Sequence, residues 1–380
     1  MMGGPWLHRR GVITGALAIG AAPLVSRTSL AQTVDLATTP VARGLQHPWG
    51  LAFLPDGRFL VTERPGRLRL ISRDGVVGPP LSGTPAVDAT GQGGLLGIAL
   101  SPSFARDRLV FLSFAEPRGG STNGTAVFRG RLSASGTALE DGRTIWRQDP
   151  PISSRLHFGS RLVFDRTGHL FVTTGERFSQ MDQSQNGTNT LGKLVRITAE
   201  GAPAGDAGAS RGWNPAIHAI GLRNVQGAAL HPETGRLWIS NHGPRGGDGL
   251  YVARAGANYG WPLISWGTHY DGRPVNGGLR ERADLVQPLV HWTPSIAPAG
   301  IAFYTGDLMP AFRGNLFVTA LAAQTLVRVV LDGETVVRQE RLLGDVGQRF
   351  RDVQQGPDGA LYLLTDSAEG AVLRLAPRGA

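Results

Sequence analysis

Cysteine is absent from this chain of 380 residues, and lysine is almost absent. The lack of cysteine excludes disulfides, thiolate metal sites and cysteine nucleophiles. Lys193 is the only lysine, so arginine supplies nearly all of the positive charge behind the formal net charge of +9. Arginine binds planar anions through two parallel hydrogen bonds, which would suit an acidic small molecule. Coding bias in a GC-rich genome is the alternative explanation for the arginine excess.

The sequence also lacks long apolar runs, long helical periodicity and clustered basic residues. The apolar run from Gly11 to Val25 has 15 residues, which is shorter than the roughly 20 that a membrane-spanning helix needs. No membrane span is therefore expected. Arginines are scattered and aromatic residues make up only 7% of the chain, so nucleic-acid binding is not expected either.

The first 31 residues have the pattern of an export signal peptide. Arg9 and Arg10 precede the apolar run, and Ser29-Leu30-Ala31 offers a small-residue cleavage site. Paired arginines favour twin-arginine export, with ordinary secretion as the alternative. The mature protein is then expected to comprise residues 32–380 and to be periplasmic or secreted.

A repeated pattern fills this mature part of the chain. Each repeat has a small and apolar stretch, a turn, and a strand-like alternation of apolar residues. The turns are spaced 45 to 79 residues apart. The six repeats begin at Trp49, Leu96, Gly159, Val225, Ala299 and Arg351, and their turn residues are Gly57, Asp107, Gly168, Gly235, Gly314 and Gly359.

Repeats of this length, with several strands in each, are typical of propeller blades. Further strands are predicted from Gly66, Gly192, Thr325 and Gly370. The sequence therefore predicts an all-β, six-bladed β-propeller that forms a single domain over residues 32–380. A two-sheet sandwich is the alternative, but the period is too long and too persistent for one.

Candidate site residues precede the expected innermost strands. In a propeller these entry loops meet at one mouth of the central channel, so residues far apart in sequence come together. Arginines, amides and a histidine gathered there would favour an anionic ligand. The candidates are Gln92, His157, Arg223, Asn224, Trp292, Arg349 and Arg351.

Two further features add possible chemistry to this mouth. His157 precedes a strand and Glu176 follows it, so the acid could hold the histidine as a general base. Gly243 and Pro244 lie in a loop after the fourth repeat's strand, where their carbonyl oxygens could bind calcium, which prefers hard oxygen ligands. A Gly-Pro pair is also common in ordinary turns.

Eight motifs in these segments resemble the soluble quinoprotein glucose and aldose sugar dehydrogenases. The resemblance extends from about Gly44 to Pro377 and is specific only when the motifs are taken together. It implies a six-bladed propeller that binds pyrroloquinoline quinone (PQQ) and calcium and oxidises the C1 hydroxyl of aldoses. The motifs are HPWGLAFLPDG, GQGGLLG, HFGSRLVFD, GLRNVQG, HGPRGGD, NYGWP, PSIAP and RFRDV.

The resemblance also implies roles for individual residues. His157 matches the family's general base, Glu176 the acid that supports it, and Arg223 the arginine beside the reactive quinone oxygen. Asn224 is the neighbour of that arginine in the cofactor site. The matched cofactor contacts are Gln92, Arg349 and Arg351, and the matched calcium carbonyls are those of Gly243 and Pro244. Trp292 is a candidate substrate contact.

This chain departs from the family at three positions. Ala322 stands where the family usually has a lysine that contacts PQQ, and Lys193 lies in another repeat. Asn241 and Gly249 replace residues that are usually acidic, which puts a second, structural calcium in question.

Two alternatives to a sugar dehydrogenase stay open. One is a propeller without catalytic activity or with an altered cofactor, which the loss of the lysine favours. The other is a calcium-dependent hydrolase of the lactonase type, although such enzymes surround their metal with acidic and amide side chains. The preferred sugar, the electron acceptor and the oligomeric state are not predicted.

Overall fold

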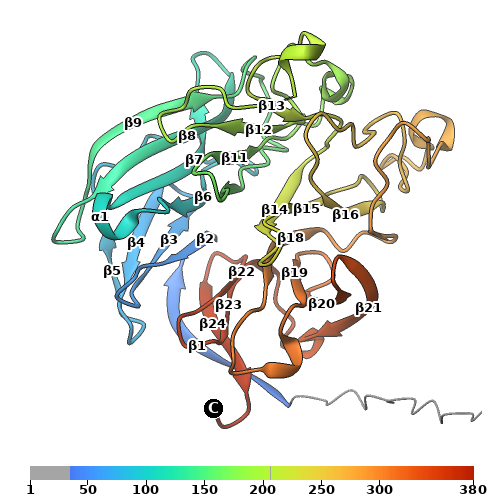
Figure 1. Cartoon of the computed structure of the whole chain (residues 1–380). Coiled ribbons are helices and arrows are strands. Elements are labelled where there is room, and N and C mark those ends of the chain that lie inside the picture. The colour runs from blue at the N-terminus through green and yellow to red at the C-terminus, as the bar shows by residue number, and fades with distance from the viewer. Residues whose placement is uncertain (1–34, 206) are drawn as a thin grey trace, which may run out of the picture. The chain divides into compact units, whose positions relative to one another are not determined.

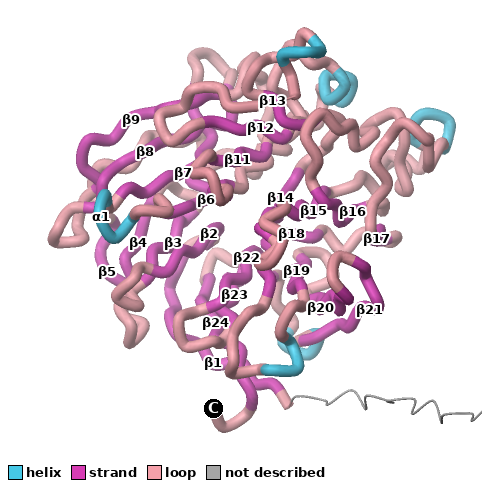
Figure 2. Tube along the Cα trace, viewed as in Figure 1, coloured by secondary structure: helices cyan, strands magenta, loops and turns pink. Residues whose placement is uncertain are grey.

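The computed structural model describes residues 35–205 and 207–380, and it confirms the six-bladed β-propeller (Figures 1 and 2). These residues form six antiparallel sheets of four strands each. The expected export signal at residues 1–31 lies outside the described part of the chain. Within the described part, no helix has the length and apolar character needed to cross a membrane.

Blades 1 to 3 follow the chain in order, each running outward from the channel. Blade 1 contains β2 (Pro48–Phe53), β3 (Phe59–Glu63), β4 (Arg67–Ile71) and β5 (Val77–Pro80). Blade 2 contains β6 (Leu95–Leu100), β7 (Leu109–Pro117), β8 (Asn123–Leu132) and β9 (Leu139–Arg147). Blade 3 contains β10 (Leu162–Phe164), β11 (Leu170–Thr173), β12 (Leu194–Ile197) and β13 (Ile217–Ala219).

Blades 4 and 5 continue this order, and blade 6 closes the ring with a strand from the other end of the chain. Blade 4 contains β14 (Val225–Leu230), β15 (Leu237–Asn241), β16 (Asp248–Val252) and β17 (Val290–Trp292). Blade 5 contains β18 (Pro298–Phe303), β19 (Leu316–Ala320), β20 (Thr325–Asp332) and β21 (Thr335–Leu342). Blade 6 contains β22 (Phe350–Gln355), β23 (Leu361–Thr365), β24 (Gly370–Pro377) and, outermost, β1 (Leu36–Leu45).

The helices of the described residues are all short. They are α1 (Phe104–Asp107) and the 3-10 segments η1 (Met181–Gln185), η2 (Ala209–Arg211), η3 (Val275–Gly278), η4 (Pro310–Phe312) and η5 (Gly344–Val346). The turn expected at Asp107 is α1, with Arg108 in the left-handed conformation at its end. The other five predicted turns have glycine with φ between +69° and +84°, the left-handed region that glycine adopts at low cost.

The six innermost strands contact one another in a closed ring: β2, β6, β10, β14, β18 and β22. Glycine permits this close approach. A side chain at Gly97 of β6 would lie 2.1 Å from the carbonyl oxygen of Ser160, and one at Gly227 of β14 would lie 2.1 Å from that of Ala299. Both positions therefore need glycine for backbone contact between neighbouring blades, rather than for a turn.

Hydroxyl groups on the second strand of a blade bind the innermost segment of the next blade. Thr62 donates to Leu96 O at 2.5 Å, and Ser113 donates to Ser160 O at 2.6 Å. Ser240 donates to Ala299 O at 3.0 Å in the same way. These repeated contacts fix the angle between blades, and so they fix where each entry loop meets the channel.

Candidate active site

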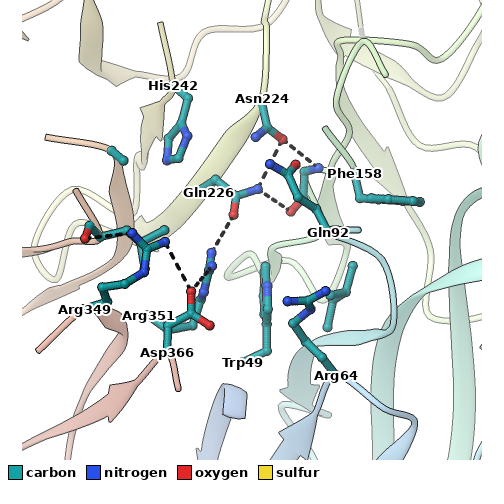
Figure 3. Close-up of a pocket in the computed structure, with 14 residues that line it drawn as sticks. Trp49, Arg64, Gln92, Phe158, Asn224, Gln226, His242, Arg349, Arg351 and Asp366 are labelled. Carbon is teal, nitrogen blue, oxygen red and sulfur yellow. Dashed lines mark hydrogen bonds and ion pairs between the residues drawn. The ribbon is translucent and has the colours of Figure 1, made fainter. Parts of the chain in front are cut away.

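A cavity of about 280 Å³ lies where the entry loops of the six blades converge (Figure 3). Every blade contributes to its walls, through loops before innermost strands and after second strands. Most of the labelled side chains in Figure 3 are polar and point toward a common centre. The lining residues are Trp49, Arg64, Gln92, Leu96, Phe158, Gly159, Asn224, Gln226, His242, Ala297, Leu321, Arg349, Arg351 and Asp366.

His157 and Glu176 form a buried pair beside this cavity. The Nδ1 of His157 lies 2.7 Å from the Oε1 of Glu176, and the two residues are 4% and 0% exposed. Among the described residues, no group hydrogen-bonds the Nε2 of His157. A carboxylate on Nδ1 selects the tautomer whose Nε2 has a free lone pair, which is the form a general base requires.

The backbone of His157 is held from several sides. Its N–H donates to the Oε1 of Gln92 at 2.8 Å, and its φ is +52°. A side chain at Gly175 would lie 2.0 Å from His157 O, so the strand that leads to Glu176 can pass only with glycine there. Strained backbone that surrounding contacts enforce is frequent at functional sites.

Burial and neighbouring charges set the protonation of this pair. Burial, together with the charges of Arg223 and Arg177, holds the pKa of His157 well below its usual value. Burial raises the pKa of Glu176 to about 7, against the opposing charge of Arg223. The imidazole is therefore neutral at neutral pH, and ionisation of the supporting carboxyl controls the pair near pH 7.

Arg223 and Asn224 lie directly before β14, next to this pair. Arg223 is 3% exposed, and its Nη1 donates to Gly243 O at 2.8 Å. Asn224 accepts hydrogen bonds from Gly159 N at 3.0 Å and from the amide of Gln226 at 3.2 Å. These contacts join the entry loops of blades 3 and 4, which fixes the guanidinium of Arg223 near the base.

The opposite wall of the cavity is cationic. Arg351 donates to Asp366 at 2.8 Å and to the side-chain oxygen of Gln226 at 3.0 Å, and Arg349 donates to Leu321 O at 3.1 Å (Figure 3). Burial alone would raise the pKa of Asp366, but Arg351, Arg349 and Arg64 outweigh it and lower the pKa to about 2. Three guanidinium groups and one carboxylate leave this wall with an excess of positive charge.

Some buried polar atoms around the cavity have no hydrogen-bond partner among the described residues. They include the Nε of Arg223 and the Nε of Arg351. A buried polar atom without a hydrogen bond is costly, so such a group at a cavity indicates that a polar ligand completes the site. The unpaired guanidinium nitrogens and the cationic wall therefore fit an acidic ligand.

The loop with Gly243 and Pro244 is organised by Asp248, at the start of β16. The carboxylate of Asp248 accepts hydrogen bonds from Gly243 N at 2.9 Å, Ser295 Oγ at 2.7 Å and Ile296 N at 2.8 Å. It thus joins the loop of blade 4 to the entry loop of blade 5. Within the described residues, no three His, Asp or Glu side chains are grouped to hold a metal, so a cation here would depend on carbonyl oxygens.

The family model for glucose/sorbosone dehydrogenases matches residues 45–374 of this sequence. The aldose sugar dehydrogenase YliI of Escherichia coli strain K12 is 43% identical over 338 residues, which cover 88% of this chain and 91% of YliI. The chain belongs to the glucose/sorbosone dehydrogenase family. This membership confirms the resemblance that the motifs indicated.

Solved structures of dehydrogenases in this group have the same fold. The soluble aldose sugar dehydrogenase of Escherichia coli in its apo-form has a TM-score of 0.87 and 41% identity, over 90% of this chain and 100% of that one. The PQQ-bound aldose sugar dehydrogenase of Streptomyces coelicolor has a TM-score of 0.76 and 28% identity, over 90% and 98% of the two chains.

The structure of this dehydrogenase places Trp292 away from the cavity, contrary to our expectation from sequence. Trp292 is 7% exposed in the core between blades 4 and 5, and its indole N–H donates to Gln339 at 2.7 Å. It ends β17, the outermost strand of blade 4, whereas candidates such as Arg223 and Arg351 precede or begin an innermost strand. The interpretation of Trp292 as a substrate contact has no support in this geometry.

Ala322 lies in the turn after β19, next to the cavity residue Leu321. Ala322 N donates to Ile296 O at 3.0 Å, which anchors the turn. Arg349 reaches Leu321 O in the same place, so a guanidinium lies close to the position of the lost lysine.

Sequence reasoning missed several polar residues of this site. Three of them lay within recognised motifs: Gln226 in GLRNVQG, and His242 and Asp248 in HGPRGGD. Burial, followed by the charge of Arg223, lowers the pKa of His242 to about 3, and its Nε2–H donates to Pro298 O at 2.6 Å. Arg64 and Asp366 follow second strands, and only the sheet order brings those positions to the mouth.

Proposed function

We propose that this chain is a PQQ- and calcium-dependent aldose dehydrogenase of the periplasm, acting on the C1 hydroxyl. The observation that carries the proposal is the His157–Glu176 pair, at 2.7 Å, beside a cavity with three arginines. Family membership and the PQQ-bound relative from Streptomyces coelicolor support it. The expected signal peptide at residues 1–31 supports the periplasmic address.

The contacts to PQQ and calcium would come from the cationic wall and from loops on the other side of the cavity, including the loop with Gly243 and Pro244. Arg349 and Arg351, with Gln92 and Asn224, would bind the carboxylates and polar edges of PQQ through charge-assisted hydrogen bonds. The carbonyl oxygens of Pro244 and of Gly243, which also accepts a hydrogen bond from Arg223, would hold calcium. When bound, PQQ supplies the hydride acceptor, and calcium supplies Lewis-acid polarisation.

The protein's own part of the reaction is proton transfer and charge stabilisation. The Nε2 of His157 takes the proton of the C1 hydroxyl as hydride leaves C1, which converts the aldose to its lactone. The Glu176 carboxylate stabilises the imidazolium that forms. Arg223, 3% exposed, supplies positive charge on the side where negative charge grows.

Reconstitution of the purified protein tests this function. We expect that PQQ with calcium gives a quinone absorption band and aldose-dependent dye reduction, and that either component alone gives little. Magnesium in place of calcium is the matched control, because the magnesium ion is smaller and demands a more regular ligand shell. Acid release from lactones without any quinone would instead support a hydrolase, and silence in every assay would remove the dehydrogenase proposal.

A further inference from the structure

We infer that Phe178 and Tyr270 form an aromatic rim that packs on the apolar face of the aldose ring and selects the sugar. The inference rests on the function proposed above and names its substrate class: pyranoses with an uninterrupted C–H face toward this rim. Phe178 lies in the loop between β11 and β12, and Tyr270 in the loop between β16 and β17. The rim therefore bridges blades 3 and 4.

The two rings cover the two side chains to which we assign the chemistry. The ring of Phe178 meets that of His157 edge to face, with centroids 5.3 Å apart. Tyr270 lies over Arg223, whose guanidinium carbon is 6.0 Å from the ring centroid and whose Nη2 is 3.5 Å from the hydroxyl. The rim therefore borders the place beside His157 and Arg223 where C1 of the sugar would react.

The rings also support each other while remaining open to solvent. They stack with centroids 6.2 Å apart and planes 29° apart. Phe178 is 44% exposed and Tyr270 is 62% exposed, the highest exposures among aromatic side chains of the described residues. An exposed aromatic pair beside a polar cavity is a common platform for ligands that have one apolar face.

The backbone holds Phe178 in place at a conformational cost. Arg177 and Phe178 both have left-handed backbone, with φ of +64° and +68°, which is unfavourable for residues other than glycine. The buried guanidinium of Arg177 offsets this cost. It donates to Leu156 O at 3.0 Å and to Ser154 O and Asn123 Oδ1, both at 2.6 Å. Arg177 is thus a positioning residue for the rim.

Backbone hydrogen bonds of a hairpin hold Tyr270 in place. It lies at the tip of a short hairpin in which His269 and Arg273 are hydrogen-bonded at 2.8 Å. Thr268 joins this hairpin to Arg245 through two backbone hydrogen bonds of 2.9 and 3.2 Å. Arg245 follows Gly243 and Pro244, so the rim and the proposed calcium loop are parts of one connected segment.

Pyranose chemistry explains the selectivity. A hexose whose ring hydroxyls are equatorial presents only C–H groups on each face, and such a face packs on aromatic carbon. An axial hydroxyl on the packed face separates the sugar ring from the rim. That hydroxyl also loses its hydrogen bonds to water. Glucose should therefore be preferred over at least one of its epimers mannose (axial at C2) and allose (axial at C3).

The test compares Phe178→Ala and Tyr270→Ala with the parent, using all three hexoses. Each variant should raise KM for glucose by about three- to tenfold, the usual worth of an aromatic contact. Turnover number and PQQ affinity should change less than twofold, and preference for glucose should shrink. Tyr270→Phe, which keeps the ring, should keep the KM for glucose and the preference for glucose close to those of the parent. Val76→Ala, which truncates an exposed side chain in the turn between β4 and β5, is the surface control.

The outcomes separate this inference from the function on which it rests. If the parent oxidises aldoses but both alanine variants keep its KM and its preference, the rim does not contact sugar. If the alanine variants instead shifted the pH profile and left KM unchanged, the rim would only exclude water from His157. That result would also overturn the inference. A parent that neither binds aldose in calorimetry nor oxidises it would remove the proposed function, and the rim with it.

Discussion

At the scale of single residues, the contact between His157 and Glu176 has the most direct consequence. The proposed base is neutral, buried and oriented by one carboxylate oxygen. His157→Ala should lower turnover by roughly 10²–10⁴-fold, the usual contribution of a positioned base. PQQ should still bind, because the arginines that would hold it are unchanged. His169→Ala, in the turn between β10 and β11, is the control; an equal loss there would point to unfolding instead.

The same pair predicts the pH dependence of the reaction. Glu176 must be ionised to accept from Nδ1, and burial raises its pKa to about 7. Activity should therefore rise with pH through about 7. In Glu176→Gln the supporting group no longer titrates, so the rise should move to lower pH, toward the depressed pKa of His157, at reduced maximal turnover. An unchanged pH profile of kcat/KM in this variant would contradict the assignment.

Arg351 predicts how tightly the cofactor is held. Its side chain is 11% exposed and it pairs with Asp366. Arg351→Ala should weaken PQQ binding by roughly 1.5–3 kcal/mol, the range for hydrogen bonds to charged groups. Asp366→Asn is the matched variant: it removes a negative charge near an anionic ligand, so binding should stay equal or tighten. Calorimetric titration with PQQ measures both effects. Unchanged affinity in Arg351→Ala would show that Arg351 does not contact the cofactor.

At the scale of elements, the loop before β16 depends on one buried carboxylate. Asp248 is 0% exposed and accepts hydrogen bonds from loops of two blades. Asp248→Ala leaves those donors unpaired, so the Gly243 and Pro244 carbonyls should lose their alignment. We expect calcium affinity to fall about tenfold or more, with PQQ affinity lowered only when calcium is present. A calcium titration, monitored through the quinone absorption band, measures this change in affinity.

Asp271→Ala provides the comparison for Asp248. Its carboxylate is exposed and pairs with Arg273, two residues away. Its loss should leave calcium affinity unchanged, since exposed ion pairs contribute little. Equal calcium affinity in Asp248→Ala and the parent would show that the loop does not hold the metal.

At the scale of the whole molecule, Arg161 ties blades together inside the channel. It pairs with Asp352 at 2.7 Å, donates to Gln226 O at 2.6 Å, and stacks over Trp49 at 4.1 Å. Four blades thus meet at one buried guanidinium. Arg161→Met should lower the free energy of unfolding by roughly 3–5 kcal/mol, because it leaves the Asp352 carboxylate buried without its partner.

Urea denaturation measures this effect on the whole propeller. The control is Arg58→Met, which breaks an exposed pair with Asp56 and should cost about 0–1 kcal/mol. Replacing both Arg161 and Asp352 with apolar residues should recover part of the loss. If Arg161→Met were as stable as the parent, the channel pair would not hold the blades together.

The sequence by itself determined the repeat and therefore the fold. Strand alternation and glycine turns depend on local backbone preferences, and six repeats leave little choice but six blades. It also located residues within the motifs before innermost strands, such as His157, Arg223 and Arg351, because blade position is periodic along the chain. The prediction that Trp292 lies at the channel mouth was wrong, because Trp292 ends an outermost strand.

Only the tertiary structure decided which side chains meet. Asp366, Arg64 and Asp248 follow or begin other strands of the blades, and their partners are distant in sequence. The protonation of Glu176 and His157 was also beyond the sequence, because burial and the nearby guanidinium groups set it. Periodicity is a local property of the chain, whereas desolvation and charge proximity exist only after the blades have closed around the channel.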